Sequence, residues 1–133
     1  MSTEGKKIKL FLVEDDEFAL EVMKDRFSDN KQLEVSVFAT AEECITKIGE
    51  KPEVVVLDFF LNKVNEKAMN GAEALDLILK SSELTKVIML TGQFDLTTAE
   101  ELMKRGAYYY ISKDESALDK LERKVNYIVS FLS

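Results

Sequence analysis

Residues 54–58 of the chain read Val-Val-Val-Leu-Asp, an apolar run that ends in an acid. Pro52, the single proline of the sequence, stands just before this run. A strand that is apolar at every position is typical of the centre of a parallel sheet, which helices cover on both faces. The run is much too short to cross a bilayer. We therefore interpret Val54–Leu57 as a buried central strand that delivers Asp58 to one edge of a sheet.

Outward from this run, short apolar strands alternate with amphipathic helical segments. The other expected strands are Ile8–Val13, Leu33–Phe38, Val87–Leu90 and Tyr108–Ile111. Apolar residues at helical spacing predict the inward faces of five helices, at Phe18, Ala19, Val22, Met23 and Phe27, then Ala41, Cys44, Ile45 and Ile48, then Leu75, Ile78 and Leu79, then Leu96, Ala99, Leu102 and Met103, and finally Leu118, Leu121, Val125, Ile128, Val129 and Leu132. This alternation predicts an α/β domain, a doubly wound parallel sheet of five strands with five helices.

Local signals mark several helix ends. Thr40 to Glu43 form a capping-box pattern at the start of the second helix. Gly71 opens the third helix, and Gly106 ends the fourth as a glycine after the last turn does. The 133 residues suit one domain over positions 1–133.

Composition excludes several classes of function. A net charge of −7 argues against direct nucleic-acid binding, and no histidine is present to form a zinc site or a Ser–His or Cys–His pair. No apolar stretch could cross a membrane, and no signal-peptide core follows Met1 to Lys9, so we expect no membrane contact and a cytoplasmic location. The single cysteine, Cys44, lies on an apolar helical stripe and is predicted to be a buried structural thiol.

Polar side chains stand where four of the five expected strands end. They are Glu14, Asp15 and Asp16 after the first strand, Asp58 after the third, Thr91 and Gly92 after the fourth, and Ser112 and Lys113 after the fifth. The carboxyl ends of parallel strands meet at one edge, where open α/β sheets bind ligands. Close carboxylates repel one another by about 4 kcal/mol per pair at an effective dielectric near 20, so the cluster needs a cation. Oxygen ligands suit Mg²⁺ with phosphate, Lys113 adds positive charge, and Asp58 is the candidate nucleophile.

Each residue also has an ordinary interpretation. Asp15 and Asp16 could simply favour the start of the first helix through its dipole. Thr91-Gly92 could form a turn, and Lys113 could be a solvated lysine. Asp58 is harder to explain this way, because an acid that closes an apolar run without turn residues is unusual.

Four segments together resemble the receiver domains of response regulators, including stand-alone chemotaxis-type receivers. They are Leu12–Asp16, Val55–Asp58, Met89–Gly92 and Gly106–Lys113. The resemblance covers the chain from Ile8 to about Leu132. It implies a flavodoxin-like sheet with strand order 2-1-3-4-5 and a role in two-component signal transduction. The chain would accept a phosphoryl group itself and act on no external substrate.

The resemblance also implies roles for individual residues. Asp58 would accept the phosphoryl group, and Mg²⁺ (or Mn²⁺) would bind Glu14, Asp15, Asp58 and the backbone carbonyl of Phe60. Thr91 and Lys113 would contact the phosphoryl oxygens, and Gly92 would leave room for them. Thr91 and Tyr110 would be switch residues, the tyrosine ring moving inward as the threonine moves toward the phosphoryl group. The implied donor is a sensor histidine kinase or a histidine phosphotransfer protein, and the implied receiver of the signal is a downstream protein target or an output domain.

The sequence departs from the family in two places. The loop between Asp58 and Gly71 is longer than usual, with an insert at about Lys63–Ala68. Asp114 follows Lys113 where the family has a cis-proline, so that peptide bond is expected to be trans or strained, and the added acid could compete for the lysine. These departures leave open an interaction module that works without phosphorylation. A phosphatase with an aspartate nucleophile, or a flavodoxin-like cofactor binder, is a further alternative, although no second acid follows Asp58 closely and no glycine-rich loop follows the first strand.

Overall fold

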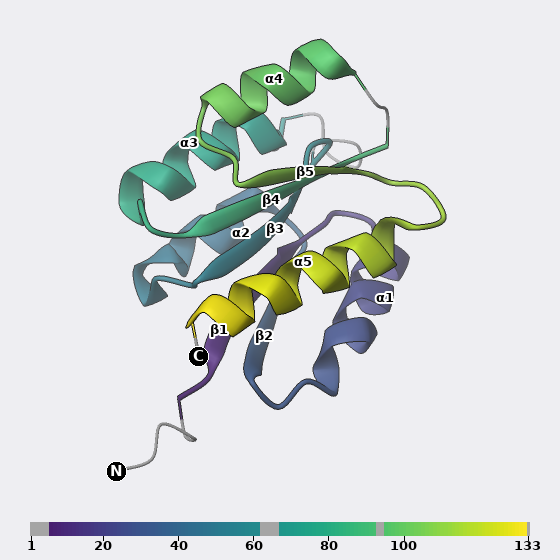
Figure 1. The fold of residues 1–133 in the computed structure, drawn as a ribbon. Helices are drawn as coiled ribbons and strands as arrows, with labels where there is room; N and C mark the ends of the chain where they lie inside the picture. The colour runs from purple at the N-terminus through teal and green to yellow at the C-terminus, as the bar shows by residue number, and fades with distance from the viewer. Residues whose placement is uncertain (1–5, 62–66, 93–94, 133) are drawn as a thin grey trace.

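β3 (Val54–Asp58) lies at the centre of a parallel sheet in this computed structural model, which describes residues 6–61, 67–92 and 95–132 (Figure 1). Within these residues the sheet has five strands, and the others are β1 (Ile8–Val13), β2 (Leu33–Phe38), β4 (Lys86–Thr91) and β5 (Tyr109–Ser112). Their order is β2-β1-β3-β4-β5, and every pair is parallel. The predicted fold class and strand order are confirmed.

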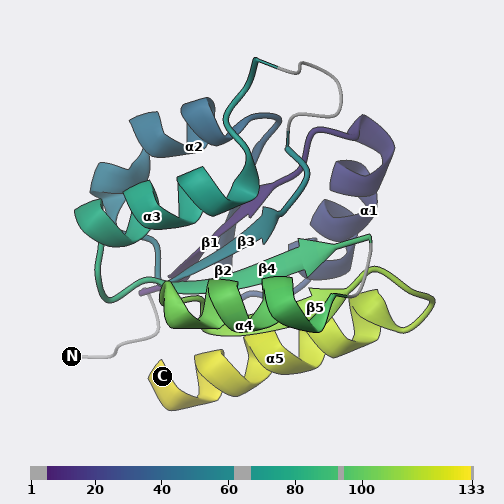
Figure 2. The ribbon, with the colours of Figure 1, turned by 90° about the horizontal axis from the view of Figure 1, so that it is seen from above.

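Helices cover both faces of the sheet. They are α1 (Glu17–Ser28), α2 (Ala41–Thr46), α3 (Gly71–Ser81), α4 (Leu96–Lys104) and α5 (Ala117–Leu132), with a 3₁₀ turn at Ile48–Glu50. α1 and α5 lie on one face, and α2, α3 and α4 lie on the other (Figures 1 and 2). No helix among the described residues is both long and apolar enough to cross a membrane.

β3 joins the two halves of the core, as its unbroken apolar pattern predicts. Val54 and Val56 pack with α1 and α5, whereas Val55 and Leu57 pack with α2, α3 and α4. All five residues of the strand are buried. Period-two alternation in a strand covered on both faces requires an apolar residue at every position, and Asp58 is the single exception.

Helix ends follow the expected local chemistry. The side chain of Asp16 accepts hydrogen bonds from the N–H groups of Phe18 and Ala19 at 3.0 and 3.2 Å, so this residue caps α1. Thr40 caps α2 by accepting from the N–H of Glu43 at 3.1 Å. Gly106 ends α4 with a φ of 109°, a left-handed conformation that favours glycine. Asp16 therefore has the ordinary role that the sequence left open for it.

Some apolar residues predicted to point inward are exposed instead. They are Phe18 at 79%, Leu96 at 61%, Met103 at 43% and Leu132 at 49%. All four belong to the first or last turn of a helix. The remaining differences are small: β4 is one residue longer at each end than predicted, β5 is shifted by one residue, and α2 ends before Ile48.

The predicted thiol and the predicted insert have different outcomes. Cys44 is fully buried, and burial raises the pKa of its thiol to about 12, so it is a structural residue as expected. The insert at residues 63–68 lies mostly outside the described residues.

Candidate functional site

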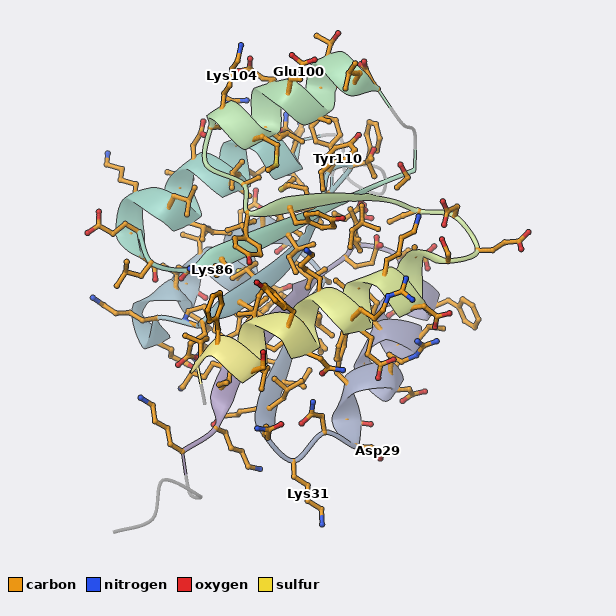
Figure 3. The ribbon with its side chains drawn as sticks, in the orientation of Figure 1. Asp29, Lys31, Lys86, Glu100, Lys104 and Tyr110 are labelled. Atoms are coloured by element: carbon orange, nitrogen blue, oxygen red, sulfur yellow. The ribbon has the colours of Figure 1, made fainter. Side chains whose placement is uncertain are left out.

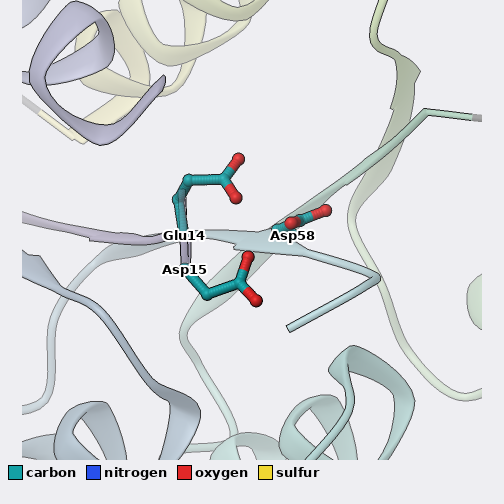
Figure 4. Close-up of side chains that lie close together, drawn as sticks. All are labelled: Glu14, Asp15 and Asp58. Atoms are coloured by element: carbon teal, nitrogen blue, oxygen red, sulfur yellow. The ribbon is translucent and has the colours of Figure 1, made fainter. Parts of the chain in front are cut away.

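Three carboxylates meet at the carboxyl end of the sheet. Glu14 and Asp15 follow β1 directly, and Asp58 is the last residue of β3. Because Val13 pairs with Leu57 in the sheet register, the residues that follow each strand are neighbours. Each residue offers a carboxylate oxygen, and these oxygens all lie within 4.8 Å of one another (Figure 4). The structure thus brings together the three side chains that the sequence pattern selected.

Two of these carboxylates are removed from solvent. Glu14 is 1% exposed and Asp58 is 0% exposed, whereas Asp15 is partly exposed. Oδ1 of Asp58 accepts a hydrogen bond from the N–H of Phe60 at 3.2 Å. Oδ2 of Asp58 has no hydrogen-bond partner among the described residues. A buried carboxylate oxygen without a partner is costly, so this oxygen marks a place where a cation or a reacting group fits.

Lys113 brings a positive charge into the cluster from the end of β5. Its Nζ lies 2.6 Å from Oε1 of Glu14 and 3.3 Å from Oδ1 of Asp58. The backbone helps to place it, because the N–H of Lys113 donates to the carbonyl of Thr91 at 2.6 Å. The convergence of the lysine with the acids, which lie far from it in sequence, is as predicted.

Burial and the neighbouring charges shift two pKa values in the cluster. Burial raises the pKa of Glu14 to about 7, and the nearby Asp58 carboxylate adds to this rise, while Lys113 opposes it. For Lys113, burial acts to lower the pKa, but the hydrogen bond to Glu14 and the charge of Asp58 outweigh it and the net pKa is raised. Lys113 therefore stays charged near neutral pH, and Glu14 holds its proton to a higher pH than an exposed glutamate does.

Thr91, Gly92 and Tyr110 border the cluster on the β4–β5 side. Thr91 ends β4 and is buried, with Ser112 as its partner in the register of β5. A Cβ built on Gly92 would have no atom of the described residues within 4 Å, so these residues leave space open beside it. Tyr110 is half-buried and packs in the core layer that includes α4 (Figure 3). The inward movement of this ring stays a prediction.

Gly71 is a residue of the site that the sequence placed only as a helix start. A Cβ at this position would lie 2.6 Å from Cα of Phe59 and 2.7 Å from the carbonyl oxygen of Asp58. Its N–H also donates to the carbonyl of Phe59 at 2.9 Å. α3 therefore begins directly against the backbone that carries Asp58. The available signal was a poor helix former at the first helical position, and that signal alone does not reveal a contact partner.

The loop before α3 is held at two more points. The side chain of Asn70 and that of Glu73 form a reciprocal capping box at the start of the helix. Oε2 of Glu42, on α2, accepts a hydrogen bond from the N–H of Met69 at 2.8 Å. These contacts fix the far end of the loop that leaves Asp58.

Asp114 is turned away from the acidic cluster. The peptide bond between Lys113 and Asp114 is trans. Oδ1 of Asp114 accepts from both the N–H and the hydroxyl of Ser116, at 2.9 and 2.7 Å, and Oδ2 lies 3.8 Å from Nζ of Lys120. The expected competition for Lys113 was wrong, because the acid makes a local turn at the start of α5 instead.

Comparison with known proteins identifies the family. Residues 10–126 match the sequence pattern of the response regulator receiver domain. The chain belongs to the response regulator receiver family. It is thus a receiver domain of the two-component type, as the four sequence segments suggested.

Curated relatives of this receiver domain are longer proteins. It is 34% identical over 112 residues to the probable C4-dicarboxylate response regulator DctR of Bacillus subtilis, and the matched region covers 81% of this chain and 46% of that protein. It is 32% identical over 120 residues to a protein-glutamate methylesterase/protein-glutamine glutaminase of Pyrococcus horikoshii, and that matched region covers 86% of this chain and 30% of the other protein. The chain thus spans less than half the length of these relatives.

Solved structures agree with this placement. The signal receiver domain of a putative Luxo repressor protein from Vibrio parahaemolyticus superposes with a TM-score of 0.81 at 25% identity, covering 93% of this chain and 91% of that one. A CheY-like response regulator receiver domain protein from Methanospirillum hungatei gives a TM-score of 0.78 at 27% identity, covering 92% and 94%. The receiver fold is therefore shared over nearly the whole chain.

Proposed function

We propose that Asp58 accepts a phosphoryl group from a phosphohistidine of a sensor histidine kinase or a histidine phosphotransfer protein. The observation that carries this proposal is the environment of Asp58. It is a fully buried carboxylate beside an acidic pair, and its Oδ1 lies 3.3 Å from the Lys113 ammonium, while its Oδ2 has no hydrogen-bond partner among the described residues. A purely structural aspartate would have both oxygens satisfied.

The acidic cluster fits a divalent cation. Glu14, Asp15 and Asp58, with the backbone carbonyl of Phe60, would hold Mg²⁺ (or Mn²⁺) through oxygen atoms alone, which is the ligand type these ions prefer. When bound, the ion would neutralise negative charge on the transferring phosphoryl group. The clustering of these three carboxylates, whose oxygens all lie within 4.8 Å of one another, supports a cation at this place.

The transfer needs a nucleophile, a counter-charge and space. Oδ2 of Asp58 would attack phosphorus as the bond from phosphorus to the imidazole nitrogen breaks, and the imidazole would leave with that electron pair. The Lys113 ammonium, already at the cluster, would neutralise charge on the phosphoryl oxygens. Thr91 would donate its hydroxyl to one of them, and the open space beside Gly92 would accommodate them.

The signal would leave through the face formed by α4, β5 and α5. A phosphoryl group on Asp58 would draw Thr91 toward it and free the space into which the half-buried Tyr110 ring can turn. Phosphorylation would thereby shift the population between two arrangements of this face. A downstream protein target or an output domain would bind one arrangement better than the other. Hydrolysis of the acyl phosphate would reset it, with no external substrate.

Incubation with acetyl phosphate and Mg²⁺, followed by intact mass measurement, tests the proposal. The wild-type chain should gain the mass of one phosphoryl group, and EDTA or the Asp58→Asn substitution should abolish the gain. Asp16→Asn is the matched control, because it makes the same chemical change next to the site at a residue that caps α1, and asparagine also caps helices. A mass gain that survives in Asp58→Asn would assign the phosphoryl group to another residue, and no gain in the wild type would favour the phosphorylation-independent interaction module.

A further inference from the structure

The charged side chains of α5 are sorted onto two sides of the helix. Its acids Asp119 and Glu122 face α1, where the Arg26 guanidinium lies 2.8 and 3.1 Å from their carboxylate oxygens. Its bases lie toward β5 instead, and they are Lys120, Arg123 and Lys124. A local concentration of three cations is notable in a chain whose net charge is −7.

These bases line a hollow together with two tyrosines. The hollow has a volume of about 270 Å³ and is bordered by Tyr109, Lys120, Arg123, Lys124 and Tyr127. Nζ of Lys124 lies 3.9 Å from the ring centre of Tyr109 and 5.6 Å from that of Tyr127. Both distances are within the range of a cation–π attraction, and the contact with Tyr109 is the closer one.

Little in the described chain neutralises this hollow. No carboxylate of the described residues lies within ion-pair distance of Arg123 or Lys124, and Lys120 has only the 3.8 Å approach of Asp114. Tyr109 and Tyr127 are 39% and 54% exposed. The apolar surface continues along α5, because Phe131 is 71% exposed and its ring centre is 5.5 Å from that of Tyr127.

This combination favours one class of ligand. Ammonium and guanidinium groups bind carboxylates, and exposed aromatic rings bind apolar side chains, so an acidic peptide that carries aromatic or aliphatic residues suits both. Nucleic acid suits it less well, since three cations neutralise few phosphates and the rest of the surface repels them. The hollow is positively charged, whereas the chain as a whole is negatively charged. A second copy of the chain could therefore be attracted to the hollow, and it is the main competing occupant.

We propose that the hollow formed by Tyr109, Lys120, Arg123, Lys124 and Tyr127 binds an acidic, apolar-bearing segment of a partner protein. This rests on the proposed function in taking the face that includes β5 and α5 as the output surface. It adds the chemistry of the partner to that function. The binding itself needs only the exposed side chains, so it is measurable in the unphosphorylated chain.

Binding of a fluorescent peptide of alternating Asp and Phe, followed by anisotropy at low salt, tests the proposal. The wild-type chain should bind it and should not bind the same peptide with Lys in place of Asp. Arg123→Glu and Lys124→Glu should each weaken binding about tenfold, as expected when an attractive charge contact becomes repulsive. Lys80→Glu, on α3 at the other face of the sheet, makes the same change in net charge and should leave binding within about twofold.

The aromatic part of the hollow is tested separately. Tyr127→Ser should weaken binding several-fold without changing its salt dependence, because it removes ring contacts and no charge. Circular dichroism of each variant confirms that the fold is kept. Equal binding of the Lys peptide, or losses in Lys80→Glu as large as in Arg123→Glu, would overturn the proposal.

Other occupants give distinct results. If sedimentation shows a dimer that Arg123→Glu dissociates, the hollow binds a second copy and the partner proposal fails. If a single-stranded RNA oligonucleotide displaces the peptide at lower concentration than the peptide itself binds, the ligand is nucleic acid and the proposal also fails. Asp58→Asn should bind the peptide as the wild type does, so failure of phosphoryl transfer and failure of this site are told apart.

Discussion

The two charged regions of this receiver domain, the acidic cluster at the end of β1 and β3 and the basic hollow on α5, differ in how much water reaches them. Glu14 and Asp58 are almost completely buried and are held close to Lys113. In the hollow, Arg123 and the two tyrosine rings are exposed. Both regions gather charges of one sign, but only the first does so in a place that solvent cannot screen.

This difference separates stability from binding. A buried charge costs several kcal/mol unless its partners are correctly placed, so the acidic cluster depends on the backbone and on the one lysine that reaches it. An exposed charge contributes little to stability by itself and stays available to a partner. We therefore expect changes in the cluster to alter the free energy of unfolding and the response to pH, and changes in the hollow to alter binding alone.

The largest effect is expected at Gly71, which tests how rigid the support of the buried cluster is. Gly71→Ala should lower the free energy of unfolding by about 3 kcal/mol, because the new Cβ would lie within 3 Å of the backbone of Asp58 and Phe59, which cannot move aside. It should also slow phosphorylation by displacing Asp58. Urea denaturation and the acetyl phosphate assay measure the two effects.

Gly49→Ala is the matched control for this packing effect. A Cβ on Gly49 would meet nothing within 4 Å in the part of the chain that the structure describes, so this variant should differ little from the wild type. Equal stability of the two alanine variants would show that α3 can retreat from Asp58 and that the site is less rigid than the structure indicates.

The next effect is a dependence of stability on pH that comes from Glu14. Its pKa is 4.5 in the unfolded chain and about 7 in the folded chain, so between these values the folded chain holds a proton that the unfolded chain has released. The contribution is fully present below pH 4.5 and is lost as pH rises through about 7, a fall of about 3 kcal/mol. Urea unfolding at pH 5.5 and pH 8 measures the part of this fall that lies above pH 5.5, about 2 kcal/mol.

Glu14→Gln separates this contribution from those of other groups. The variant cannot titrate, so its stability should fall less between pH 5.5 and pH 8 than that of the wild type, and its free energy of unfolding at pH 8 should be higher. Parallel pH curves for the two proteins would contradict the assignment of the shift to Glu14.

A pair of lysine substitutions compares the two regions directly. Lys113→Met should cost about 2 kcal/mol at pH 8, because it leaves Glu14 and Asp58 without their counter-charge; this is below the cost usual for a fully buried pair, since the Lys113 side chain is 25% exposed. Lys124→Met should change the free energy of unfolding by less than about 0.5 kcal/mol. Similar losses in the two variants would remove the distinction between a buried and an exposed charged region.

The smallest effect is expected at Asp114, in the turn that leads from Lys113 to α5. Hydrogen bonds from Ser116 hold the pKa of this carboxyl below its usual range and close the turn. Asp114→Ala should lower stability slightly and slow phosphorylation by loosening Lys113, whereas Asp114→Asn should keep the turn and most of the rate. A rate for the alanine variant equal to that of the wild type would show that the backbone alone places Lys113.

The sequence predicted the strands better than the helix faces. β3 was recognisable because a strand buried on both faces must be apolar at every position, and the acid at its end then stood out. Helix periodicity over-predicted burial at Phe18 and Leu96, because the pattern does not show which turns of a helix pack against other elements. The geometry of parallel strands also explains why the sequence was enough to find Asp58, Glu14 and Lys113. Residues at the carboxyl ends of parallel strands must share one edge of the sheet.

The local pattern of the sequence therefore determined the fold class and the set of residues at the carboxyl edge of the sheet. The strand order came from the family resemblance. Tertiary structure alone decided the contact of Gly71 with the backbone of Asp58 and the pairing of the α5 acids with Arg26 of α1. The physical reason is distance along the chain. Strand and helix patterns depend on neighbouring residues, whereas these two contacts depend on which distant groups packing brings together.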